Sequence, residues 1–201
     1  MLDPFYLIVD SAAWIARLLP SGVRLVQLRL KDQPSATVRA EIIEAKALCA
    51  GAGAQLVVND YWQEAIDTGC DFIHLGQTDL DTVDLAAIRR AGLKLGVSTH
   101  DETELFRALE TQPDYIALGP IYPTILKAMA FAPQGLPRIT EWKKKIGKIP
   151  LVAIGGITLE RMAGVLEAGA DSAAVVTDIT RNANPERRAR GWVKATRRFA
   201  V

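Results

Sequence analysis

Eight short apolar runs recur at regular intervals along the 201 residues of this chain, and helical patterns separate them. The runs lie at 5–9, 24–30, 55–58, 72–75, 93–97, 114–118, 150–154 and 172–176. Between them, segments such as 35–53, 101–110 and 158–170 carry apolar residues three and four positions apart, which is typical of helices with one buried face. Continuous apolar strands that alternate with helices indicate a parallel sheet covered by helices. Eight such units predict an α/β fold, a compact (β/α)8 TIM barrel that forms a single domain over residues 1–201.

An open, doubly wound sheet is the alternative, because periodicity alone does not show that a barrel closes. The positions of the polar residues favour the barrel. The stretches "RLKD", "ND", "GQTD", "STH", "GPIYPT", "GG" and "TD" follow strands of seven different repeats. In barrels the chemistry lies at the carboxyl ends of the strands, and only a closed ring brings seven such ends together.

Charge and cysteine usage exclude several classes of function. The 24 Lys and Arg residues balance 23 Asp and Glu, so the chain lacks the global charge of a nucleic-acid-binding protein. The basic run at 186–199 is interpreted as the solvated face of a last helix. Cys49 and Cys70 have no CxxC spacing, which fits a reduced, cytoplasmic protein. No apolar run is long enough to span a membrane, so a soluble protein without a membrane partner is expected. The oligomeric state, a homo-oligomer included, is left open.

Two neighbouring predicted strands are each followed by an acid. Asn59 and Asp60 follow the run at 55–58, and Asp79 follows the run at 72–75. Adjacent parallel strands deliver both carboxylates to the same edge, and hard oxygen ligands without a nearby His or Cys cluster suit Mg²⁺. The alternative is that each acid caps the helix that follows it.

Cations follow two other strands. Gln27, Arg29 and Lys31 alternate in "QLRLKD" and so share one face, which points inward if Gln27 lines the barrel. Lys127 follows the run at 114–118. Together with Mg²⁺ these cations could hold a diphosphate, whereas ordinary salt bridging at the edge of the barrel is the alternative.

Glycines and a short polar segment follow the last two strands. Gly155 and Gly156 come after the run at 150–154, Val176 ends the run at 172–176, and Thr177 follows it. Loops at this position of a barrel often bind a phosphate through backbone N–H groups, although a glycine pair can also serve a tight turn. Two anionic sites on one rim suggest a transferase with diphosphate as the leaving group.

These motifs resemble those of the thiamine phosphate synthase family over nearly the whole chain. The matching stretches are "QLRLKD", "VVNDYWQEA", "CDFIHLGQTDLD", "GVSTHDETEL", "DYIALGPIYPT", "IPLVAIGGIT" and "AGADSAAVVTDI". The resemblance implies that Mg²⁺ assists the condensation of a hydroxymethylpyrimidine diphosphate with a thiazole phosphate. In this family the pyrophosphate leaves first, and the thiazole nitrogen then captures the pyrimidine cation.

The resemblance also implies roles for individual residues. Arg29, Lys31, Ser98 and Lys127 are expected to be catalytic, and Asp60 and Asp79 to hold the metal. The pyrimidine diphosphate is expected to contact Gln27, Arg29, Lys31, Asn59, Ser98 and Lys127. The thiazole phosphate is expected to contact Thr124, Gly155, Gly156, Val176 and Thr177.

Some residues depart from the family pattern. Leu126 replaces a threonine, Tyr61 a basic residue, and Asp178 places an acid beside the expected phosphate site. A related branch isomerises a thiazole tautomer, carries His where this chain has Pro120 and lacks the two acids, so this chain is closer to the synthases. A non-catalytic, ligand-binding paralogue is the other alternative. His100 is interpreted as a hydrogen-bonding residue at a helix start.

Overall fold

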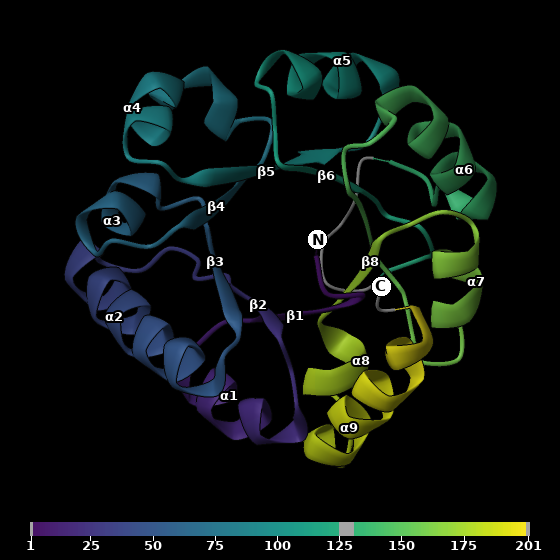
Figure 1. The fold of residues 1–201 in the computed structure, drawn as a ribbon, viewed down its shortest axis with the longest axis horizontal. Helices are drawn as coiled ribbons and strands as arrows, with labels where there is room; N and C mark the ends of the chain where they lie inside the picture. Colours follow the sequence, from purple (N-terminus) through teal and green to yellow (C-terminus); the bar gives the residue numbers. More distant parts are fainter. Residues whose placement is uncertain (1, 125–130, 200–201) are drawn as a thin grey trace.

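The computed structural model describes residues 2–124 and 131–199 and shows a closed barrel of eight parallel strands (Figure 1). The strands follow one another in chain order, and β8 pairs with β1, for example at Tyr6 and Ala174. They are β1 Phe5–Val9, β2 Leu25–Leu28, β3 Gln55–Asn59, β4 Phe72–Leu75, β5 Lys94–Thr99, β6 Tyr115–Leu118, β7 Leu151–Ile154 and β8 Ser172–Val175. The predicted (β/α)8 barrel is confirmed, and its closure excludes the open sheet.

Helices surround the barrel on its outside (Figure 1). The α-helices are α1 Ala12–Leu18, α2 Ser35–Ala52, α3 Trp62–Asp67, α4 Leu85–Arg90, α5 Glu102–Glu110, α6 Gly135–Ile146, α7 Met162–Glu167, α8 Thr177–Thr180 and α9 Pro185–Thr196. Short 3-10 helices are η1 Leu19–Ser21, η2 Asp79–Asp81 and η3 Arg197–Phe199. The helices predicted at 35–53 and 101–110 are confirmed as α2 and α5.

The helix predicted at 158–170 begins later than expected, at Met162. The backbone N–H groups of Arg161 and Met162 both donate to the Thr158 carbonyl, at 3.0 Å each, so 158–161 forms a turn before the helix. The basic run at 186–199 folds as α9 and η3. Trp192 is buried there and stacks on Phe5 with ring centroids 5.4 Å apart, while most of the basic side chains face solvent, as predicted.

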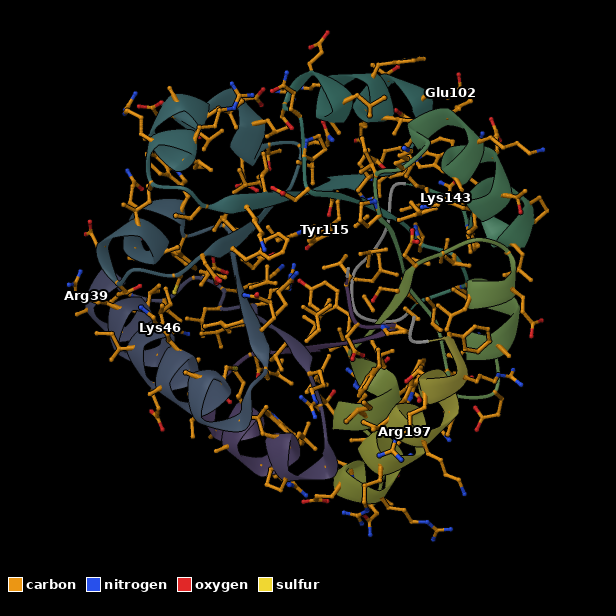
Figure 2. The ribbon with its side chains drawn as sticks, in the orientation of Figure 1. Arg39, Lys46, Glu102, Tyr115, Lys143 and Arg197 are labelled. Atoms are coloured by element: carbon orange, nitrogen blue, oxygen red, sulfur yellow. The ribbon has the colours of Figure 1, made fainter. Side chains whose placement is uncertain are left out.

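The core has two layers, because alternate residues of each strand point to opposite faces of the sheet. One layer packs between the strands and the helices. The other fills the barrel with Tyr6, Ile8, Leu25, Val57, Phe72, Tyr115, Ala117, Val152 and Ala174. Figure 2 shows Tyr115 inside the ring of strands, whereas Arg39 and Lys46 lie on the outside. The polar residues Gln27, Asn59 and His74 are also buried, and they lie near the carboxyl ends of the strands, here called the rim.

Candidate active site

Asp60 and Asp79 form an acid pair on the rim. Asp60 directly follows β3, and Asp79 is the first residue of η2 after β4. Their carboxyl groups share a hydrogen bond, and the Asn59 side chain also bonds to the Asp60 carboxyl. The Gly76 N–H donates to Asp79 Oδ2 at 2.7 Å, which fixes the second acid.

The electrostatics of this pair favour a bound cation. Burial, and then the charge of Asp79, raise the pKa of Asp60 to about 6, although the nearby Arg29 guanidinium opposes the shift. Two carboxyls this close repel each other once both are ionised, and a divalent cation between them would relieve that repulsion. Within residues 2–124 and 131–199, no cluster of three or more His, Cys, Asp or Glu residues could hold a metal. Two carboxylates fit Mg²⁺, which commonly completes its shell with water and phosphate oxygens.

Neither acid is a helix cap, so that alternative is wrong. Tyr61 is the N-cap residue of α3 and makes no side-chain capping bond. Asp84, not Asp79, caps α4, and its Oδ1 accepts from Ala87 N at 2.9 Å. The two acids are therefore available for another role.

Arg29 and Lys31 follow β2 beside the acid pair. The Arg29 N–H donates to the Val9 carbonyl at 2.8 Å, which fixes its backbone against β1. Both residues line a cavity of about 430 Å³ together with Asp10, Leu30, Gln33, Thr37 and Glu41. Arg29 therefore links this cavity, which neither Asp60 nor Asp79 lines, to the acid pair, because its guanidinium acts on the Asp60 carboxyl. The predicted Lys127 lies outside the described residues, as does Leu126.

Gln27 and Ser98 differ in how far they are buried. Gln27 is buried and its Nε2 donates to the Tyr6 hydroxyl at 3.0 Å, so at least one of its donors is used inside the protein. Ser98 is half-buried in β5, and its Oγ lies 2.8 Å from His74 Nε2.

Sequence reasoning missed His74, which is buried and contacts Ser98 directly. Burial, with a smaller effect of Arg29, lowers the pKa of His74 to about 3, so the imidazole is neutral at physiological pH. Period-two alternation could have found it, because His74 shares the inward face of β4 with Phe72.

The glycine pair after β7 has a clear packing role. Gly155 and Gly156 have φ values of 99° and 63°, in the left-handed region that favours glycine. A Cβ on Gly155 would lie 2.7 Å from Pro120 Cα, so the loop after β7 could not pack this closely against the loop after β6. Val176 packs against the inner core, and Thr177 begins α8. Packing accounts for the glycines, and their binding of phosphate remains a hypothesis.

Asp178 does not present a free charge to this part of the rim. Its carboxyl accepts from Arg188 at 2.7 and 2.8 Å, and from Trp192 Nε1 at 2.7 Å. It also accepts from the Leu159 N–H at 3.3 Å. The side chain is only 9 % exposed. The acid that departs from the family pattern is therefore neutralised and tied to α9 and to the turn before α7.

His100 has the predicted role at the start of α5. Its Nδ1 lies 2.7 Å from Glu104 Oε2, and its backbone N–H donates to the same oxygen at 2.7 Å. Its ring also stacks on Phe131, with centroids 4.7 Å apart.

A closed (β/α)8 barrel with charged side chains gathered at the carboxyl ends of its strands is the architecture of an enzyme that acts on small molecules. Residues 5–179 match the family described as thiamine monophosphate synthase. A thiamine-phosphate synthase from Rhizobium etli is 67 % identical over 195 residues, which cover 97 % of this chain and 96 % of the relative. One from Cronobacter sakazakii is 50 % identical over 194 residues, covering 96 % and 89 %. The chain therefore belongs to the thiamine monophosphate synthase family, and it is an enzyme of the transferase class.

Solved structures agree on the fold. The thiamine phosphate pyrophosphorylase from Pyrococcus furiosus matches with a TM-score of 0.87 and 23 % identity, over 99 % of this chain and 98 % of that one. A 3-hexulose-6-phosphate synthase also matches, with a TM-score of 0.66 and 15 % identity, over 96 % and 99 %. None of the helices described here is long and apolar enough to cross a membrane.

Proposed function

We propose that the enzyme condenses 4-amino-2-methyl-5-hydroxymethylpyrimidine diphosphate with a thiazole phosphate in a Mg²⁺-dependent reaction that forms thiamine phosphate and releases pyrophosphate. The observation that carries this proposal is the acid pair Asp60 and Asp79 beside Arg29 at the rim. Membership in the family supplies the reaction class, and the acid pair supplies the reason for a metal. The relatives cited above are named for the same product.

The residues on the β2 to β5 side would bind the diphosphate. Arg29 offers a bidentate guanidinium and Lys31 a compact charge, both at the wall of the 430 Å³ cavity. Asn59 orients the Asp60 carboxyl through its hydrogen bond. Magnesium bound to the acid pair would supply positive charge to the leaving pyrophosphate. Ser98 and Lys127 complete this set by resemblance to the family.

The chemistry then needs no general base. The C–O bond of the pyrimidine diphosphate breaks, and its electron pair leaves with pyrophosphate. The lone pair of the thiazole nitrogen forms the new C–N bond to the cationic carbon. What this chain supplies is stabilisation of the charge on the leaving group and alignment of the two substrates.

The thiazole phosphate is assigned to the β6 to β8 side. The candidate contacts are Thr124, Gly155, Gly156, Val176 and Thr177. The close packing of the loops after β6 and β7 places Gly155 against Pro120, which supports a shared wall for the second substrate. Because Asp178 is paired with Arg188, its charge does not oppose an anion there.

Pyrophosphate release with both substrates tests the proposal. We expect release only when both substrates and Mg²⁺ are present, and none in excess chelator. Asp60→Asn and Asp79→Asn should each lower turnover by about 10²-fold or more, because each removes a charge from the metal site. Asp81→Asn is the matched control, since Asp81 lies in the same 3-10 helix but pairs with Arg107 at the surface.

Other outcomes separate the alternatives. An isomerase would convert a thiazole tautomer without metal and without pyrophosphate. A non-catalytic paralogue would bind substrate without turnover. Full activity of both acid variants would contradict the metal site. Separate assays with the carboxylated and the decarboxylated thiazole phosphate would show which form the enzyme uses.

A further inference from the structure

Five side chains form one hydrogen-bonded chain across the inside of the barrel, here called the interior chain. It begins where Gln27 Nε2 donates to the Tyr6 hydroxyl at 3.0 Å. The Tyr6 and Tyr115 hydroxyls are 3.1 Å apart, and the Tyr115 hydroxyl lies 2.7 Å from His74 Nδ1. The interior chain ends where His74 Nε2 meets Ser98 Oγ at 2.8 Å. Ser98 is its one member that is not buried, so it connects the barrel interior to the rim.

The donors and acceptors in the interior chain have one consistent direction. An amide nitrogen only donates, so the Tyr6 oxygen accepts from Gln27. Among the contacts of the described residues, the Tyr6 hydroxyl meets only Gln27 and Tyr115, so its own proton goes to Tyr115. Tyr115 then donates to His74 Nδ1. A neutral imidazole carries one N–H, which is therefore on Nε2 and donates to Ser98.

The burial of the interior chain supports this direction. His74 is 7 % exposed and each of its ring nitrogens meets a hydroxyl group, so Nδ1, which accepts from Tyr115, carries no proton and the imidazole does not donate from both nitrogens. With the Gln27 amide nitrogen facing Tyr6, a reversed direction would leave the Tyr6 proton without an acceptor in the barrel interior, and a buried unsatisfied donor is costly.

Gly96 provides the space that the interior chain needs. A Cβ at this position of β5 would lie less than 3.0 Å from three atoms of Tyr115, including its hydroxyl oxygen. The bare glycine lets the Tyr115 ring lie across β5 and stack on His74, with centroids 5.5 Å apart and planes 12° apart. The geometry of the interior chain is therefore built by packing as well as by polar contacts.

We propose that the interior chain fixes the Ser98 hydroxyl as a donor that points out of the barrel, and that His74 and Tyr115 are positioning residues that act through Ser98. The Ser98 oxygen already accepts from His74, so its own proton is available to an acceptor on the rim. Resting on the function proposed above, that acceptor is an oxygen of the diphosphate substrate. The position fits, because the Asp60 N–H donates to the His74 carbonyl at 2.9 Å, which places Ser98, His74 and the acid pair on neighbouring strands.

The tautomer of His74 tests the direction without any substrate. The chain contains two histidines, so ¹⁵N spectra of histidine-labelled protein show two imidazoles, and His100→Gln identifies which signals belong to His74. We expect His74 to be protonated on Nε2 alone, with no change between about pH 5 and 8. Tyr115→Phe should perturb the Nδ1 signal, because it removes the donor to that nitrogen. A His74 protonated on Nδ1 would overturn the proposal whether or not the enzyme makes thiamine phosphate.

A double-mutant cycle tests whether Tyr115 acts through Ser98. Tyr115→Phe should lower kcat by roughly 3- to 10-fold, the scale of one hydrogen bond, with a smaller change in KM. In the Ser98→Ala background the same change should cost nothing further, whereas a merely structural role would give additive losses.

Ser172→Ala is the control for this cycle. Its hydroxyl is buried and donates to the Asp3 carbonyl at 2.7 Å, at the start of β8 and at the opposite end of the barrel. It should change stability without changing kcat. Additive kcat losses for Tyr115 and Ser98 would overturn the positioning role, and absent wild-type turnover with the predicted tautomer intact would instead contradict the proposed function.

Discussion

Asp60 combines two unfavourable features in one residue. Its φ of 65° lies in the left-handed region, which a residue with a Cβ seldom adopts. Its carboxyl is partly buried and shares a hydrogen bond with Asp79. Strain and like charge persist where the surrounding structure holds them in place, and such positions are concentrated at functional sites. The neighbouring Asn59, which is 4 % exposed, holds the carboxyl from the end of β3.

The acid pair predicts how stability depends on pH in the absence of metal. The pKa of Asp60 is raised from 3.8 to about 6, so the folded state holds this proton more tightly than the unfolded state. Its contribution to stability is present in full below about pH 4 and is lost as the pH rises through about 6. We expect the melting temperature in chelator to fall over this range, and Asp79→Asn to reduce the fall, because the coulombic partner is gone.

Melting curves between about pH 4 and 8 measure this effect. Asp81→Asn, an exposed acid in the same 3-10 helix, is the control and should leave the pH profile unchanged. If the melting temperatures of the wild type and of Asp79→Asn fall by the same amount over this pH range, repulsion between the two acids is contradicted.

At the scale of elements, Asp178 joins three parts of the fold. Asp178 lies in α8, and its carboxylate forms an ion pair with Arg188 of α9. The same carboxylate accepts hydrogen bonds from Trp192 of α9 and from the backbone of Leu159 in the turn before α7. The sequence indicated an acid beside a phosphate site, but it could not show that Arg188, ten residues later, returns to the same carboxylate. That pairing depends on how α8 and α9 turn back on each other, which no local pattern records.

Removal of this carboxylate should destabilise the protein strongly. We expect Asp178→Ala to lower the free energy of unfolding by about 2–3 kcal/mol, because Arg188 and the Trp192 N–H lose a partner that is 9 % exposed. Glu160→Gln is the matched control, since Glu160 bonds to the same Arg188 but is 68 % exposed, and exposed ion pairs contribute little. Urea unfolding of both variants measures the difference. Equal losses of unfolding free energy in the two variants would show that the buried carboxylate of Asp178 stabilises the protein no more than the exposed one of Glu160.

At the scale of the whole barrel, the strands and the acid pair could be predicted from the sequence, whereas the interior chain could not. All eight strands were predicted, because each strand is a short, mostly apolar run and each is followed by a helical pattern. The acid pair was predicted because adjacent parallel strands end at the same rim. The interior chain was missed, because Tyr6 and Tyr115 are 109 residues apart and meet across the barrel. Their contact depends on barrel closure and on the space at Gly96, and neither is visible in local periodicity.

Binding of the leaving group should stabilise the molecule as a whole, because the rim draws its residues from separate strands. A ligand at about 100 times its Kd adds about 2.7 kcal/mol to stability, or roughly 5–10 °C in melting temperature for a chain of this size. We expect Mg²⁺ and pyrophosphate together to raise the melting temperature by this amount, and each alone to raise it much less. The acid pair would bind Mg²⁺ and the cations would bind pyrophosphate, and each bound ion attracts the other. Sulfate at matched ionic strength controls for general anion effects, and Asp79→Asn should remove the synergy while leaving the weak effect of pyrophosphate alone. An equal shift with pyrophosphate in chelator would show that Arg29 and Lys31 hold the anion without a metal, and the acid pair would then need another explanation.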